Sequence, residues 1–311
     1  LRTSAVRLLY LLDETDEKKD ISVLFSVSLC LCEPEVIFKP SLDVKMAVNF
    51  RDISESILDD IFTMAELVPR ISNAESDYLD FIKKQKEIMA LRSEFMARVD
   101  LSIERANIKR NTFLDYSYLW TDSRSDYMYY FLNYGRQLTE EELVTLDEDE
   151  VAKKETIKKE PPTLLQFQEQ INHYEAIYEE VKQIECTKVF NLWFRADITP
   201  FKTSLLNCVK RWSYAFKKHL LDHVVNSLKD LNDFIEVADE GLMVSVQEGD
   251  YAGLINVMEF LQRVKEKQAS TETRFEPLKE VMEVLKNYGV VIPEESMVQL
   301  QELPERWANT K

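Results

Sequence analysis

The strongest structural signal in this sequence is residues 199–241, which read TPFKTSLLNCVKRWSYAFKKHLLDHVVNSLKDLNDFIEVADEG. Apolar side chains recur there every three or four positions, a spacing that places them on one face of an α-helix. Thr199 is a good N-cap, and Pro200 suits the first helical position. We therefore predict a single helix over residues 199–240, about 60 Å long at ~1.5 Å per residue.

The apolar face of this helix indicates how it packs. Its spacing drifts between three and four and never settles into a strict heptad, which favours packing in a helical bundle over a two-stranded coiled coil. The predicted face consists of Phe201, Leu205, Val209, Trp212, Phe216, Leu220, Val224, Leu228, Leu231 and Ile235.

Helical patterns continue on both sides of this long helix. Upstream, Thr163-x-x-Gln166 is a capping box. Downstream, we predict one helix over about 250–268, with Asp250 as its N-cap, and a second that follows the capping box Thr273-x-x-Glu276. The upstream helix is expected to carry one apolar face, made of Ile171, Tyr174, Ile177 (or Tyr178), Val181 and Ile184.

Proline and glycine set the expected ends of the C-terminal helices. Pro277 is tolerated in the first turn of the helix after Thr273, and Gly289 ends that helix. A last helix begins at Pro293 and stops before Pro304, because proline is unfavourable in a helix interior.

Residues 21–39 show the one good strand signal in the chain. Apolar residues alternate from Val23 to Leu31, Glu33-Pro34 supplies a turn, and Val36 and Phe38 resume the alternation. Period-2 alternation around a turn predicts a β-hairpin with one buried face. A lone hairpin is marginally stable in water, so we expect helices to pack against it.

Helices are predicted on both sides of this hairpin. Residues 1–13 have the pattern of a helix end, and further helices are expected over about 75–105 and 112–134, the latter ending near Gly135. Thr139-x-x-Glu142 is another capping box. A helix up to Pro69 is expected to place Phe50, Ile53, Ile57, Ile61, Met64 and Val68 on one face.

A charged stretch divides the chain. Residues 147–162 are nearly free of apolar side chains and end in Pro161-Pro162, so they predict a linker loop that tolerates change. We expect a helical bundle with the hairpin over 1–146 and a rigid bundle over 163–272. Residues 273–311 form a last part. The fold class is mainly α, with successive antiparallel helical bundles forming an elongated stem.

Composition narrows the class of protein. The chain has 311 residues but 5 glycines, which favours long helices with few tight turns. Its net charge of −17 argues against nucleic acid and against an anionic membrane surface as partners. The 4 scattered cysteines are typical of a reducing compartment. Neither end shows a start, a signal peptide or a stop pattern, so we expect both ends to be internal to a longer chain.

We searched for residues that could carry chemistry and predict no catalytic, cofactor or metal site. His219 and His223 have the i, i+4 spacing of a metal pair but lack the Glu of a zinc protease, so packing is the better interpretation. Cys30 and Cys32 form C-x-C on a strand, not the C-x-x-C of a metal knuckle. Phosphate-binding glycine motifs are missing from the sequence. Four basic residues form a helix flank that favours solvation over a binding site: Lys210, Arg211, Lys217 and Lys218.

Three stretches resemble one known family, the axonemal dynein heavy chains. The first is Glu35–Asp43 with Asp59–Met64 downstream, and the second is Thr187–Arg195 followed by Pro200-Phe201 and Lys210–Ser213. The third runs from Phe275–Lys279 through Leu300–Trp307. Their order and spacing agree with the stem region of that family along essentially the whole chain, and the outer-arm beta type is the best match.

The resemblance implies a role without local catalysis. It implies a segment of an ATP-driven microtubule motor whose ATP and Mg sites lie in AAA+ modules far downstream. The stem would bind dynein intermediate and light chains, neighbouring heavy chains and docking components on the doublet microtubule of the axoneme. The start of the linker would fall at about residues 273–311. The alternatives are another elongated helical scaffold or a tethering-complex subunit and, much more remotely, an all-α enzyme.

Overall fold

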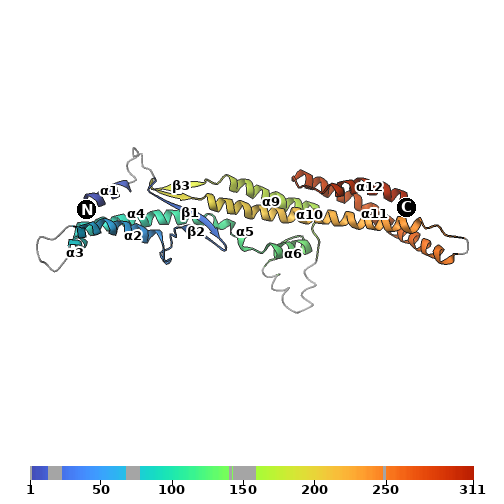
Figure 1. Cartoon of the computed structure of the whole chain (residues 1–311), viewed down its shortest axis with the longest axis horizontal. Helices are drawn as coiled ribbons and strands as arrows, with labels where there is room; N and C mark the ends of the chain where they lie inside the picture. The colour runs from blue at the N-terminus through green and yellow to red at the C-terminus, as the bar shows by residue number, and fades with distance from the viewer. Residues whose placement is uncertain (1, 13–22, 68–77, 140–141, 143–158, 248–249) are drawn as a thin grey trace. The chain divides into compact units, whose positions relative to one another are not determined.

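A computed structural model describes residues 2–12, 23–67, 78–139, 142, 159–247 and 250–311. The described chain is mainly helical and has one small four-stranded sheet, so the predicted fold class is confirmed (Figure 1). Most of the predicted linker, residues 147–158, lies outside the described residues.

The chain folds into two compact units. The first, here the sheet unit, comprises Leu1–Ser123 and Ala176–Lys210. The second, the helical unit, comprises Arg124–Glu175 and Arg211–Lys311. The chain passes between the units within two helices, α9 (Leu164–Lys182) and α10 (Thr199–Leu242). The expected division into parts at residues 147, 163 and 273 remains a prediction.

The predicted hairpin forms the first half of the sheet. Strands β1 (Phe25–Cys32) and β2 (Glu35–Lys39) pair antiparallel, with Leu29 opposite Phe38 and Leu31 opposite Val36. One face is buried, as the alternation predicted, and it consists of Val27, Leu29, Val36 and Phe38.

A second hairpin completes the sheet, and the sequence patterns did not predict it. Strands β3 (Thr187–Phe190) and β4 (Phe194–Asp197) pair antiparallel, and β4 pairs parallel with β1, giving the order β2-β1-β4-β3. The turn between them places Asn191 and Leu192 at positive φ, a conformation that L-residues adopt uncommonly. Four-residue strands give little periodic signal, and the partner strand lies more than 160 residues away in sequence.

Helices flank the sheet within the sheet unit. The predicted helix over 75–105 is two helices, α3 and α4, and the predicted helix over 112–134 is broken by a 3₁₀ turn and Ser123. The helices and 3₁₀ turns of this unit are α1 (Arg2–Leu11), α2 (Phe50–Thr63), η1 (Met64–Leu67), α3 (Tyr78–Lys83), α4 (Lys86–Asn111), η2 (Leu114–Tyr116) and α5 (Tyr118–Thr121).

The predicted apolar face of α2 is confirmed at Phe50 and wrong beyond it, while Val68 lies outside the described residues. Ile53 and Met64 are exposed and Ile57 is half-buried, whereas the buried positions are Phe50, Ser54, Leu58, Phe62 and Ala65. Two apolar stripes run along this helix, and the one that contains both phenylalanines buries more apolar surface. Ser54 is accommodated in the core because its hydroxyl donates to the Phe50 carbonyl at 2.8 Å.

The predicted core of the long helices is confirmed. Every residue of the face that runs from Phe201 to Ile235 in α10 is buried, and so are Ile171, Tyr174, Ile177 and Val181 of α9. The exception is Ile184, which follows the end of α9 and is half-buried. The helical unit also contains α6 (Arg124–Tyr134), α11 (Tyr251–Asn287) and α12 (Glu294–Thr310).

The capping boxes that the sequence predicted at Thr139 and Thr163 are present. Thr163 N–H donates to the Gln166 side chain at 2.7 Å, and Thr139 N–H donates to Glu142 at 2.9 Å. The Arg136 guanidinium and the Thr139 N–H together lower the pKa of Glu142 to about 2. Gly135 and Gly289 follow their helices at positive φ, as helix-terminating glycines do.

The predicted break between 268 and 273 is wrong, because α11 is one continuous helix. The Thr273 hydroxyl donates to the carbonyls of Ala269 and Ser270, so it bonds inside the helix and caps nothing. Thr271 and Leu278 are buried on either side of the expected break. Burial of these side chains offsets the hydrogen bond that Pro277 removes.

The predicted end of the last helix before Pro304 is also wrong. Helix α12 continues through Pro304 to Thr310. Leu303 and Trp307 are buried, and the Trp307 ring lies 5.8 Å from that of Phe234 in α10. Anchors on both sides of the proline therefore hold the helix together.

Candidate interaction surfaces

The His219–His223 pair has the contacts of packing residues. His219 is half-buried and stacks on Phe167, with ring centroids 5.7 Å apart. Burial, and secondarily the neighbouring His223, lower the pKa of His219. In the part of the chain that is described, no group of three His, Cys, Asp or Glu side chains is placed to hold a metal. The interpretation of the pair as structural remains a prediction.

The cysteines form no cluster with other reactive side chains among the described residues. Cys30 and Cys32 are half-buried on the face of β1 opposite Val27 and Leu29, and the four cysteines form no disulfide. Asp250 caps α11 by accepting from Gly253 N–H at 2.9 Å, as its position predicted. Gly249 lies outside the described residues.

Two members of the basic flank are engaged by neighbouring side chains. In the sheet unit, Lys210 Nζ lies 5.2 Å from the centre of the Tyr178 ring. In the helical unit, Lys217 Nζ lies 2.7 Å from a Glu175 carboxylate oxygen. Arg211 and Lys218 are exposed. The interpretation of the flank as a solvated helix side remains a prediction.

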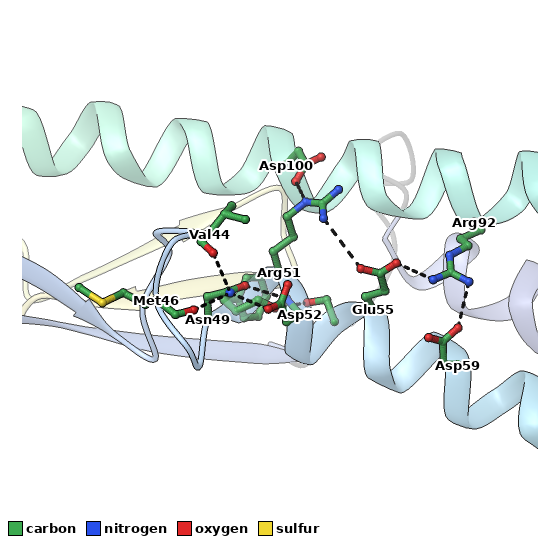
Figure 2. A network of polar contacts seen from close by, with 11 residues as sticks. Val44, Met46, Asn49, Arg51, Asp52, Glu55, Asp59, Arg92 and Asp100 are labelled. Carbon is green, nitrogen blue, oxygen red and sulfur yellow. Dashed lines mark hydrogen bonds and ion pairs between the residues drawn. The ribbon is translucent and has the colours of Figure 1, made fainter.

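A loop in the sheet unit is held in shape by one buried amide. Asn49 is almost fully buried, and its Oδ1 accepts from Asp52 N–H at 2.8 Å to cap α2 (Figure 2). Its Nδ2 donates to the Met46 carbonyl at 3.1 Å and to the Val44 carbonyl at 3.4 Å. One side chain thus satisfies both a helix start and two loop carbonyls, which specifies the loop conformation.

Ion pairs beside this loop join α2 to α4. Arg92 in α4 lies between Glu55 and Asp59 of α2, and Arg51 of α2 donates to Asp100 of α4 at 3.0 Å (Figure 2). The hydrogen bond to Glu55 is the largest cause that raises the pKa of Arg92. Each pair is partly exposed and contributes little alone, but together they fix α2 on α4. Asp59 is therefore engaged in the ion pair with Arg92 that joins α2 to α4.

The loop that Asn49 holds presents apolar side chains to solvent. Val44, Met46 and Val48 are 58%, 50% and 68% exposed, although their backbone is ordered from inside by Asn49. An apolar cluster displayed on a fixed backbone is typical of a protein-binding surface. We refer to Val44, Met46 and Val48 as the loop patch.

Comparisons with known proteins show which family this chain is related to. A family model described as "Dynein axonemal heavy chain 2/5/8 coiled-coil" matches residues 215–310, which comprise α10 from residue 215 onward, all of α11 and all of α12. The chain is 44% identical over 306 residues to "Dynein beta chain, ciliary" of Tripneustes gratilla and 43% identical over 304 residues to "Dynein axonemal heavy chain 17" of Homo sapiens. In both cases 98% of this chain is aligned, and it spans 7% of the relative.

The chain belongs to the axonemal dynein heavy-chain family. A more distant relative, "Dynein beta chain, flagellar outer arm" of Chlamydomonas reinhardtii, is 22% identical over 335 residues and aligns with 97% of the chain. Within this dynein segment, none of the described helices is long and apolar enough to cross a membrane.

The sequence stretches that resemble dynein fall on defined elements of the structure. Glu35–Asp43 contains β2 and leads into the Asn49 loop, and Thr187–Arg195 contains β3 and the turn before β4. Leu300–Trp307 lies in α12. The loop patch itself was missed at the sequence level, because the alternation of Val44, Met46 and Val48 is only five residues long and does not reveal that they lie in an exposed loop.

Proposed function

We propose that this chain is a segment of the stem of an axonemal dynein heavy chain of the outer-arm beta type. The observation that carries the proposal is the 44% identity to a ciliary dynein beta chain over 98% of this chain, which is 7% of that relative. We assign residues 1–146 and 163–272 to stem bundles, 147–162 to a linker loop, and 273–311 to the start of the linker.

The proposed role is to anchor the motor and to bind accessory chains in the axoneme of a cilium or flagellum. The partners would be dynein intermediate and light chains, neighbouring heavy chains and docking components on the doublet microtubule. ATP and Mg²⁺ would act in other parts of the whole protein. The loop patch supports this role, because a fixed apolar surface is suited to a protein partner.

The packing of the long helices supports a part in force transmission to the linker. In the helical unit, α10 buries an apolar side chain at nearly every turn from Trp212 to Ala238. Interiors packed in this way have low compressibility, so a helix held at each turn deforms little under load.

A pull-down from ciliary extract tests the proposal. The tagged 311-residue chain should recover dynein intermediate chains, and a Met46→Asp, Val48→Asp variant should recover less of at least one dynein subunit. The matched control is Val291→Asp, because Val291 is 88% exposed outside the loop patch. If the folded chain recovers no dynein subunit, or recovers tethering-complex subunits in their place, the stem assignment is wrong.

An ATPase assay tests the absence of catalysis in this segment. The purified chain with ATP and Mg²⁺ should hydrolyse no more ATP than buffer. Turnover that depends on a metal and is lost in a His219→Ala variant would overturn the interpretation of His219 as a packing residue.

A further inference from the structure

The first turns of α11 display an apolar stripe to solvent. Leu254, Ile255, Met258 and Leu261 are 50%, 59%, 57% and 37% exposed. Their spacing of one, four and seven positions places them on a single helix face. They line a shallow groove together with Glu259, Gln262, Lys265 and Glu266. We call these four apolar residues the α11 face.

The α11 face is additional to the face that packs on α10. Val257 and Phe260 point toward the other side, and the Phe260 ring lies so close to Gly241 of α10 that a Cβ there would be 2.5 Å from it. Helices α10 and α11 therefore pack together without using the α11 face. Four large apolar side chains at helical spacing on an exposed surface are typical of a docking site.

The helix ends around the α11 face carry more acidic than basic side chains. Residues 230–267, which include the groove, contain nine Asp or Glu residues and three Lys or Arg residues. Two of the three bases lie against aromatic rings: the Arg263 guanidinium is 5.8 Å from the centre of the Phe260 ring, and Lys267 Nζ is 4.9 Å from that of Phe234. Of the side chains that line the groove, two are acidic and one is basic. A partner is thus favoured if it brings positive charge.

We propose that the α11 face docks a basic amphipathic helix of another protein chain. The apolar stripe would receive the apolar face of that helix, and the surrounding carboxylates would attract its Lys and Arg side chains. Met258 suits such a site because its flexible thioether adapts to the incoming side chains. A second copy of this chain is disfavoured, because two acidic tips would repel each other. The inference deepens the proposed function by naming the partner chemistry of one stem surface.

A designed peptide tests this inference without knowledge of the natural partner. The probe is a 21-residue peptide of Leu and Lys, with Leu at i, i+3, i+4 and i+7 positions and Lys elsewhere. Its controls are a scrambled peptide of the same composition and a version with Glu in place of Lys. Binding to the 311-residue chain is measured by calorimetry at 50 mM and 500 mM NaCl.

We expect saturable binding of the Leu/Lys helix that weakens at high salt, because salt screens the charge attraction. The scrambled and Glu peptides should bind at least tenfold more weakly. Equal binding of the scrambled peptide, or no saturable binding of the probe, would overturn the inference.

Two sets of variants, each with a matched control, test where the Leu/Lys peptide binds. Ile255→Ser with Met258→Ser should weaken binding at least tenfold, whereas Val291→Ser should change it less than twofold. Glu240→Lys with Glu259→Lys should weaken binding and remove most of its salt dependence. Glu276→Lys with Glu280→Lys, which are exposed in the second half of α11, should do neither. All variants change exposed side chains, and circular dichroism checks that each is folded.

Three results separate this inference from the stem assignment. Binding that the α11 face variants do not affect would overturn the docking site, even if the pull-down recovers dynein chains. Self-association of the chain that is lost in Ile255→Ser, Met258→Ser would also overturn it, in favour of a second copy. A failed pull-down with intact peptide binding would overturn the stem assignment and leave the docking site supported.

Discussion

Helices α10 and α11 lie antiparallel in the helical unit, yet they use their surfaces differently (Figure 1). From Trp212 to Ala238, α10 buries an apolar side chain at nearly every turn. In α11, by contrast, the described residues 251–263 include no buried side chain, and burial begins at Val264.

Within this helix pair, we therefore expect α10 to contribute mainly to stability and the first half of α11 to contribute mainly to interaction. The second half of α11 resembles α10, because Leu278, Val281, Met282 and Leu285 are buried. The first half of α11 contacts α10 on one side only, and its opposite side is exposed to solvent. Changes in α10 should therefore affect folding, whereas changes at the start of α11 should affect binding.

The largest expected effect is the loss of a core ring from α10. Phe216 is fully buried, and its ring lies 5.3 Å from Phe131 and 5.8 Å from Tyr174. Phe216→Ala should lower the free energy of unfolding by about 3–5 kcal/mol in a urea titration, because it leaves a cavity. Ile255→Ala, at the α11 face, should change it by about 0.5 kcal/mol or less. If the two variants lost similar amounts of unfolding free energy, the proposed difference between α10 and the start of α11 would be wrong.

The next largest effect on stability is expected at the contact between α10 and α11. An alanine normally favours a helix by about 1 kcal/mol over glycine. Gly241→Ala should nevertheless destabilise the chain by about 1–3 kcal/mol, because the new Cβ would meet the Phe260 ring. Phe260→Ala in the same chain should relieve most of that loss, which a double-mutant cycle measures. A stabilised Gly241→Ala variant would show that the two helices are not in close contact there.

A smaller and local effect is expected at the start of α11. Asp250→Ala removes the cap on Gly253 N–H and should cost about 0.5–1 kcal/mol. Because the first turns bury no side chain, the loss should appear as faster amide exchange at residues 251–256 with little change in the global midpoint. Asp250→Asn should retain the exchange rates of the native chain. A large shift of the global midpoint would mean that this end of α11 belongs to the core.

The smallest expected effect is a pH dependence at His219 in α10. Burial lowers the pKa of the folded imidazole, so on acidification the unfolded chain binds this proton first, near its ordinary pKa of about 6.5. Stability from this group is therefore complete above that pH and is lost as the pH falls below it. Between pH 7.5 and 5.5 the melting temperature should fall further in the native chain than in His219→Gln, by on the order of 1 °C. His173→Gln, at an exposed position, should behave like the native chain.

The sequence predicted best where one apolar stripe runs unbroken along a helix. That is the case for the α10 face, where all ten predicted residues are buried. In α2 two adjacent stripes are both apolar, so the periodicity alone could not choose between Ile57 and Leu58. The prolines misled for a related reason, since burial of Leu278 and Trp307 beyond them outweighs their local preference.

Long-range pairing and exposed sites were the least predictable. Strand β4 is recognisable as a strand mainly through β1, its partner in the sheet, which no local pattern reveals. The loop patch depends on hydrogen bonds from Asn49, and the α11 face is visible only once the opposite side of the helix is seen to pack on α10. The packing interpretation of His219 rested on the missing ligands of a metal motif, and its ring stacking on Phe167 adds a structural reason.

Hydrogen–deuterium exchange of the free chain and of the assembled dynein tests the central claim, that this segment acts through helix faces covered by partners. Amides of residues 212–238 should exchange slowly in both states. Amides of residues 251–263 should exchange rapidly in the free chain and at least tenfold more slowly in the assembly. Exchange at 251–263 that is already as slow as at 212–238 in the free chain, or that does not change on assembly, would contradict the claim.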